Sequence, residues 1–170
     1  MFSDAMLPII WFAIIATELA LYALLDGANL GIGMLSLFPQ PEQKRALILH
    51  TLGPMWNANE TWLLVAAGSM FGAFPQVYSI MLNALYIPGM IIVVGLILRA
   101  VSFELYDFSE AKKLYGTTFG IGSLLTVIGQ GFLFGGILSG ITITNGRFGG
   151  SVFDWITPLT LLIAIGFFFA

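Results

Sequence analysis

The sequence predicts an all-α integral membrane protein, a four-helix transmembrane bundle plus the start of a fifth helix. Hydrophobic residues make up 58% of its 170 residues and charged residues only 9%, whereas soluble domains carry about 25% charged residues. Apolar segments longer than the roughly 20 residues that cross a bilayer alternate with short polar ones. The chain has one histidine and no cysteine, which excludes disulfides, thiolate metal sites and any site built from two histidines.

The first predicted helix runs from Met6 to about Phe38. An acidic residue stands before it where a signal peptide carries basic ones, and its apolar run is too long for a signal core. At about 1.5 Å per residue it exceeds the hydrocarbon thickness, so we expect its last turns at the interface. Asp26 then lies nearer that surface than the middle. Glu18 and Asp26 are eight residues apart, within roughly 80° of each other around the axis.

The second predicted helix runs from His50 to Phe74, after a loop over residues 39–45 with the sequence PQPEQKR. Its first half carries the polar cluster GPMWNANETW, residues 53–62. An ionisable side chain at that depth costs about 2.5 to 3.5 kcal/mol on insertion scales, so Glu60 must face protein or water. Asn57 and Glu60 are three residues apart and share a helix face. They form a polar stripe that needs partners on neighbouring helices.

The rest of the chain predicts two more complete helices and part of another. A third helix runs from Val77 to Leu98 with a kink at Pro88, and the charged segment 99–113 is a water-facing connector. The fourth helix, 115–141, contains GTTFG, GFLFG and GILSG, which are small-xxx-small patterns that let helices approach closely. A glycine-rich loop, 142–155, leads to an unfinished fifth helix. The expected division is therefore 1–155 for the bundle and 156–170 for the start of the fifth helix.

Basic residues predict the orientation of the chain. Five of them follow the first and third helices and one follows the fourth: Lys44, Arg45, Arg99, Lys112 and Lys113 against Arg147. Since basic loops stay in the cytoplasm, the N-terminus is expected outside. On this topology Asp26 and His50 lie towards the cytoplasm, with Asn57 and Glu60 near the midplane. That order suggests an inward route for protons.

The carboxylates have two interpretations. Glu18, Asp26 and Glu60 either pass protons or hold an ion, or they are neutral carboxyls that hydrogen-bond helices together. His50 is either an interfacial side chain without a special role or a proton donor. It has only a methionine such as Met55 as a second axial ligand, off its helix face, so the sequence predicts no haem in this chain. No metal site and no nucleic-acid partner are predicted; the only general partner is membrane lipid.

Several stretches together resemble a known family. LLDGANLGIGML (24–35), GPMWNANETWLL (53–64) and FGAFPQVYS (71–79) occur in the order found in subunit II of the cytochrome bd quinol oxidases. The resemblance implies a terminal oxidase of bacterial and archaeal plasma membranes that oxidises a quinol and reduces dioxygen to water. It also implies a partner, subunit I, that holds haem b and a d-type haem, while subunit II carries no haem and helps to supply cytoplasmic protons.

The resemblance assigns particular residues. Asp26 matches the family's acidic position on the first helix, within a DG-x-x-x-G pattern that includes Gly27 and Gly31, and the second-helix motif is matched by Trp56, Asn59, Glu60 and Trp62. Asn57 stands where many members have aspartate and Asn29 where some have a second acid. An amide cannot carry a proton as a carboxylate does, so Glu60 and Asp26 would have to do more here.

Family members are about twice this long, so the resemblance implies that the chain is an N-terminal half and does not catalyse alone. Two alternatives stay open at the level of the sequence. One is a purely structural assembly subunit whose polar stripe satisfies hydrogen bonds between helices. The other is an ion-coupled secondary transporter, which Pro88 and the glycines suggest only faintly.

Overall fold

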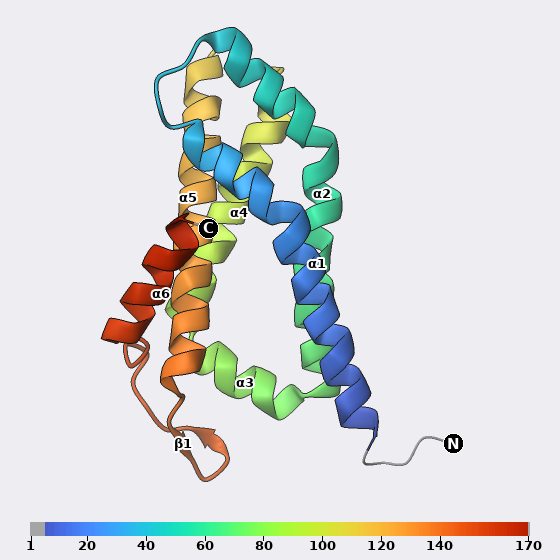
Figure 1. The fold of residues 1–170 in the computed structure, drawn as a ribbon, viewed down its shortest axis with the longest axis vertical. Coiled ribbons are helices and arrows are strands. Elements are labelled where there is room, and N and C mark those ends of the chain that lie inside the picture. Colours follow the sequence, from blue (N-terminus) through green and yellow to red (C-terminus); the bar gives the residue numbers. More distant parts are fainter. Residues whose placement is uncertain (1–5, 170) are drawn as a thin grey trace.

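The computed structural model describes residues 6–169 and is almost entirely helical (Figure 1). The prediction of an all-α membrane protein is confirmed. A short antiparallel hairpin pairs Ile143 with Phe148 and Thr144 with Arg147. In chain order the elements are α1 (Leu7–Leu35), α2 (Glu42–Ala73), α3 (Pro75–Ala84), α4 (Tyr86–Leu105), α5 (Lys112–Ser139), β1 (Ile143–Thr144), β2 (Arg147–Phe148) and α6 (Pro158–Phe169).

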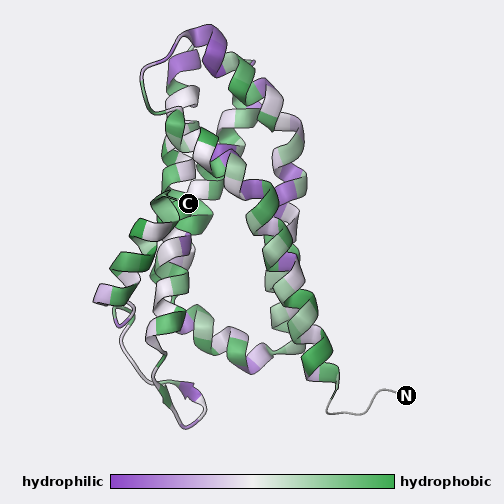
Figure 2. Cartoon of the chain, viewed as in Figure 1, coloured by the Kyte–Doolittle hydropathy of each residue, from purple (hydrophilic) through white to green (hydrophobic). Residues whose placement is uncertain are grey.

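The long helices form two antiparallel pairs. Helix α1 packs along α2, α4 packs along α5, and α6 lies on the outer side of α5. The pairs meet in the upper half of Figure 1 and diverge in the lower half, where α3 crosses from α2 to α4. Within the described residues, α1, α4 and α5 are long and apolar enough to cross a membrane. Helix α2 has 32 residues but carries more of the polar side chains (Figure 2).

The prediction of one third helix over 77–98 is wrong. The chain forms two helices, α3 and α4, and breaks at Leu85, whose φ of −114° and ψ of 26° are not helical. Pro88 makes no kink in the middle of a span, because it is the third residue of α4. Its missing N–H falls in the first turn, where no intrahelical hydrogen bond is lost. The span therefore starts later than predicted and runs further along the chain.

The prediction that a water-facing connector starts at residue 99 is also wrong. Helix α4 continues to Leu105, and Arg99 lies inside it with no exposed surface. The sequence AVSFEL after Arg99 contains no Gly or Pro that would end a helix. An apolar helix accepts an arginine at such a position only when an acidic partner is available, and the fold supplies one.

Helix α2 begins at Glu42 directly after Pro41, and not at His50. Residues 42–49 are mostly good helix formers, and a proline fits just ahead of a helix. The predicted loop over 39–45 is therefore shorter at its end. His50 lies about two turns inside α2 rather than at a helix start.

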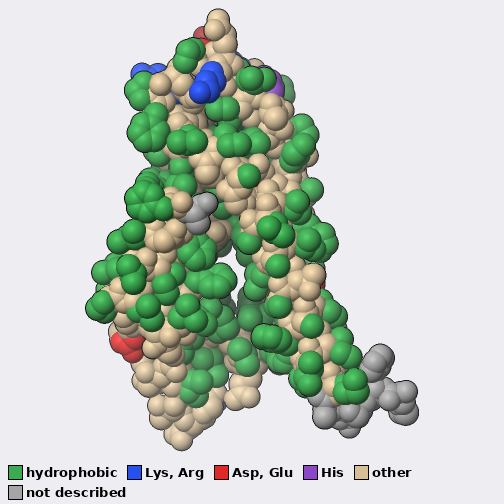
Figure 3. Space-filling model, viewed as in Figure 1, with side chains coloured by type: hydrophobic (Ala, Val, Ile, Leu, Met, Phe, Trp, Pro, Cys, Tyr) green, Lys and Arg blue, Asp and Glu red, His purple; other side chains and the backbone are tan. Residues whose placement is uncertain are grey.

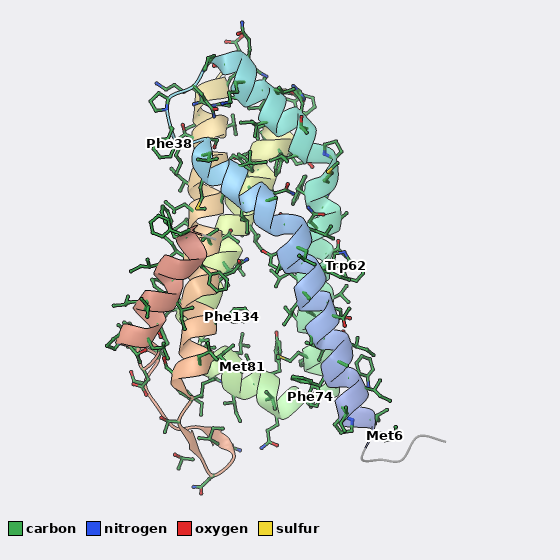
Figure 4. All side chains as sticks on the ribbon, viewed as in Figure 1. Met6, Phe38, Trp62, Phe74, Met81 and Phe134 are labelled. Carbon is green, nitrogen blue, oxygen red and sulfur yellow. The ribbon has the colours of Figure 1, made fainter. Side chains whose placement is uncertain are left out.

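The basic residues outside the spans separate to the two ends of the molecule. The α1–α2 loop and the start of α5 lie at one end, where Lys and Arg are visible in Figure 3, and Arg147 lies in the hairpin at the other. Figure 4 shows Phe38 at the first end and Met6 with Phe74 at the second. Arg99 no longer counts as a loop residue, which leaves four basic residues against one. The external N-terminus remains a prediction on that bias.

Glycines let α5 contact its neighbours closely, as the small-xxx-small patterns predicted. A Cβ on Gly131 would lie 2.5 Å from Cα of Ala164, and one on Gly135 would lie 2.6 Å from Cα of Thr160, both on α6. Towards α4, a Cβ on Gly122 would lie 2.7 Å from the carbonyl oxygen of Gly95. These are backbone approaches that side chains cannot relieve.

We expect Gly95→Ala to lower the stability of the folded protein by about 1 to 3 kcal/mol, through overpacking against α5. A Cβ there would lie 2.7 Å from the Gly122 carbonyl oxygen and 2.8 Å from the Thr126 nitrogen. Gly89→Ala is the matched control, since it lies in the same helix with nothing within 4 Å of the added atom. It should be neutral or stabilising by up to about 1 kcal/mol. Thermal unfolding in detergent measures both, and equal midpoints for the two variants would contradict the expectation.

Candidate functional site

Three charged side chains from three helices meet inside the molecule. Arg99 of α4 donates from Nη1 to Oδ2 of Asp26 at 2.7 Å and from Nη2 to Oδ1 at 2.8 Å, a bidentate pair with α1. Oε1 of Glu60, on α2, lies 3.1 Å from Nη1 of Arg99 but forms no hydrogen bond with it. We call Asp26, Glu60 and Arg99 the charged triad.

Burial differs within the triad. The side chains of Asp26 and Arg99 have no exposed surface, whereas that of Glu60 keeps 11%. With all three groups ionised the triad has a net charge of −1 in a low-dielectric interior, which is costly. One proton on a carboxyl makes the triad neutral. Since Asp26 already forms both hydrogen bonds to the guanidinium, Glu60 is the member that can take up and release this proton with least rearrangement.

Polar contacts hold the helices around the triad. The amide of Asn59 donates to the carbonyl oxygen of Leu25 at 3.0 Å, linking α2 to α1 one residue before Asp26. Tyr22 is buried one turn earlier on α1, and its hydroxyl accepts a hydrogen bond from Gln130 of α5. The triad is therefore fixed from α1, α2, α4 and α5.

The other predicted proton-transfer residues lie apart from the triad. Asn57 is exposed on α2, whereas Glu60 is buried. Glu18 is buried two turns before Asp26, where its Oε1 accepts from Ser69 at 3.1 Å. His50 is exposed, with Nε2 3.4 Å from Oδ1 of Asp107. The carboxylates of Asp26 and Glu60 both contact Arg99, so they lie close to each other; the depth of Asp26 in the membrane stays a prediction.

A cavity of about 250 Å³ opens between α2 and the end of α4. His50, Asp107 and Tyr106 line it, together with the stacked rings of Trp56 and Phe103, whose centroids are 5.5 Å apart. Burial, with a contribution from the Glu42 carboxylate, raises the pKa of Tyr106, so this hydroxyl stays neutral at physiological pH. The cavity thus has aromatic walls and charged groups.

The remaining motif residues have different surroundings. Trp62 is half-buried on α2, on the α1–α2 side of the molecule (Figure 4). Gly27 and Gly31 face open space: a Cβ on either would meet nothing within 4 Å. Their smallness is not needed for packing within the described residues. Among residues 6–169, no group of three His, Asp or Glu side chains is placed to hold a metal ion.

Sequence reasoning missed Arg99, which joins the two acids that it did identify. Arg99 was expected to end a helix because it follows an apolar run. The sequence could have predicted Arg99 as the partner of these acids. Asp26 and Glu60 lie in apolar segments and both need a cation, and Arg99 is the first basic residue after Glu60. Phe103 and Asp107 were missed for the same reason, since they followed Arg99 in the expected loop.

The family model for cytochrome bd terminal oxidase subunit II matches residues 7–170. The chain belongs to this family. Among curated proteins, it is 34% identical over 158 residues to cytochrome bd ubiquinol oxidase subunit 2 of Bacillus subtilis, covering 90% of this chain and 47% of that protein. The family expected from the sequence motifs is confirmed.

Two further members of the family are more distant. A probable cytochrome oxidase subunit 2 of Haemophilus influenzae is 27% identical, and cytochrome bd-I ubiquinol oxidase subunit 2 of Escherichia coli is 26% identical. Each match covers 94% of this chain and 44% of the relative. The chain therefore spans about half the length of the curated cytochrome bd subunits that it matches.

Proposed function

We propose that this chain is part of subunit II of a bd-type quinol oxidase, a multi-pass protein of the plasma membrane with its N-terminus outside. In that complex it assembles with a haem-bearing subunit I, which oxidises quinol and reduces dioxygen to water. The family match over residues 7–170 carries this proposal. The chain contributes helices and charged groups, and the catalytic centres belong to the partner.

The residues of this chain do not fit a haem. Its only histidine, His50, has a side chain that is 58% exposed, with Nε2 3.4 Å from Oδ1 of Asp107. Met55 is the nearest methionine in sequence, and it is itself 57% exposed, five residues along the helix and off the face of His50. We therefore assign haem b and the d-type haem to the partner subunit, and derive no step through a haem here.

Affinity purification of the complete tagged protein from native membranes tests the oxidase assignment. We expect a haem-bearing partner to co-purify, a d-type haem absorption band, and oxygen uptake that depends on added quinol. A colourless preparation of a single chain without oxygen uptake would contradict the assignment and favour an ion-coupled transporter.

Within the oxidase, we infer that Glu60 takes up protons and that Asp26 with Arg99 positions it. Glu60 is the triad member with exposed surface, and its Oε1 has no hydrogen-bond partner among the described residues. A carboxyl in such surroundings can accept a further hydrogen bond from water. Adding a proton to Glu60 changes the net charge of the triad from −1 to zero. The Asp26–Arg99 pair stays ionised in both states, so only the charge of Glu60 changes.

The cavity beside His50 is a candidate entrance for the protons that reach Glu60. It lies towards the end that the basic residues assign to the cytoplasm. Trp56 precedes Glu60 by four residues and Phe103 follows Arg99 by four, so the stacked rings lie one helical turn from the triad. We propose that protons enter from this cavity and pass the ring pair to reach Glu60. Asn57 is not on this path, and Glu18 lies beyond the triad.

A purely structural role is the second candidate, and the bidentate, fully buried Asp26–Arg99 pair favours it for those two residues. Infrared difference spectra of the oxidised and reduced complex separate the roles of Glu60. We expect a protonated-carboxyl band that changes with the redox state and is lost in Glu60→Gln. Glu18→Gln, which removes a buried carboxyl outside the triad, should keep the band. Loss of the band in Glu18→Gln alone would move the proton role away from Glu60.

A further inference from the structure

Arg45, near the start of α2, is a mostly buried cation that forms no ion pair within residues 6–169. Its exposed surface is 8%, and its Nε has no hydrogen-bond partner. Within residues 6–169 no carboxylate lies within ion-pair distance of it, in contrast to Arg99. The Nη1 and Nη2 atoms of Arg45 are not among the fully buried unpaired atoms, so the end of the guanidinium reaches the surface, where an anion can contact it. A mostly buried cation in this position favours binding an anion from outside the described chain.

The position of Arg45 against the N-terminal part of α5 also favours an anion. The side chain lies across Gly116 in the second turn of α5: a Cβ on Gly116 would overlap Cδ of Arg45 and lie 2.6 Å from its Nε. The first amides of a helix have no acceptor within the helix, and that end carries about half a positive charge. A cation beside it is repelled unless an anion binds between them. Only glycine at position 116 leaves room for this arrangement.

The nearby charges also favour an anion. Lys44 and Lys113 are exposed next to Arg45 and to the first turn of α5. Lys112 is directed elsewhere, to the carbonyl oxygens of Tyr106 and Asp107. The carboxylate of Glu42, three residues before Arg45, lies 3.5 Å from the Tyr106 hydroxyl and forms no ion pair with Arg45.

The surface around this position is apolar as well as basic. Phe38, Leu47 and Leu114 are 67%, 65% and 61% exposed there, and Figure 3 shows hydrophobic side chains close to the Lys and Arg at this end. Such a surface suits acyl chains, while a guanidinium and a helix N-terminus suit a phosphate. We propose that Arg45 and the N-terminus of α5 bind the phosphate group of a membrane phospholipid.

The test compares Arg45→Gln with Lys44→Gln in the complete subunit, purified with its partner. Both variants remove one positive charge, but only Arg45 is buried against α5. We expect Arg45→Gln to retain about tenfold less phosphatidylglycerol after purification, as loss of one charge-assisted contact predicts. Lys44→Gln should retain nearly the wild-type amount. Lipid bound per complex is counted by mass spectrometry, a readout that does not depend on oxidase activity.

Three outcomes would overturn the proposal. Equal lipid retention in Arg45→Gln and wild type would exclude a lipid site at Arg45. Inorganic phosphate that raises the melting temperature of the wild-type complex as much as phosphatidylglycerol would identify a free-anion site. Arg45→Gln that loses subunit I while each remaining subunit keeps its lipid would identify a carboxylate of the partner as the counter-ion.

The wild-type complex and a milder variant keep the proposal testable if Arg45→Gln does not fold. Reconstituted wild type should melt higher in phosphatidylglycerol than in phosphatidylcholine. Arg45→Lys keeps the charge but loses the planar fork, so it should show a smaller difference between these two lipids. Identical differences in wild type and Arg45→Lys would count against the guanidinium as the phosphate ligand.

Discussion

Replacing Arg99 with glutamine is expected to prevent the subunit from accumulating in its complex. The variant leaves Asp26, which has no exposed surface, without both of its hydrogen bonds. It also leaves Glu60 beside a second carboxylate with no cation between them. Removing one partner of a buried ion pair costs about 3 to 5 kcal/mol, which is a large share of the 5 to 15 kcal/mol that holds a typical domain folded. Immunoblots of purified membranes and thermal unfolding of any assembled complex measure the loss.

The double variant Asp26→Asn, Arg99→Gln is the informative control. It removes both charges of the pair, so Glu60 can stay neutral by keeping its proton, and much of the lost stability should return. Arg147→Gln, on the exposed hairpin strand β2, controls for the loss of an arginine as such and should change little. An Arg99→Gln subunit that assembles like wild type would show that the pair contributes nothing to folding.

Replacing Glu60 with glutamine is expected to reduce quinol-dependent oxygen uptake by about 10², with assembly preserved. Glutamine keeps the size and hydrogen-bonding capacity of the side chain, but it cannot carry the proton. It also relieves the excess negative charge of the triad, so folding should not suffer. The oxygen electrode measures turnover, and the haem content per subunit shows whether the complex is intact.

Glu18→Gln provides the comparison for Glu60. It removes a buried carboxyl that contacts Ser69 and not Arg99, so turnover should stay within about twofold of wild type, the size of effect that one neutral hydrogen bond produces. If Glu60→Gln fails to assemble, the role of Glu60 is structural. If it assembles and turns over normally, the proton enters by another path.

The hydropathy of the sequence was sufficient to predict the membrane class and the approximate spans, because apolar length alone decides which segments cross a bilayer. It did not predict the break at Leu85. Residues 77–98 are nearly all apolar, and nothing in their composition distinguishes one span from α3 followed by α4. Tertiary packing decides there, since α3 must cross between the two helix pairs.

The sequence predicted the two acidic residues of the candidate site, but it did not predict that an arginine lies between them. Asp26 and Glu60 stood out as charges inside apolar segments, whereas Arg99 stood at the end of one and was assigned to a loop. The helical wheel put Asn57 beside Glu60, but the angle of about 60° between residues three apart leaves one of them outside when the interface is narrow. In the structure Asn59 takes the inner position instead.

The order of the triad along the chain has a consequence for biogenesis. Asp26 and Glu60 are synthesised before Arg99 and enter the membrane first. Both can wait there as uncharged acids, but a guanidinium cannot lose its proton. By the time α4 is inserted, the carboxyls that accept its charge are already in place. A permuted chain that makes α4 before α1 and α2 would present an arginine to lipid with nothing to receive it, and its insertion should be correspondingly inefficient.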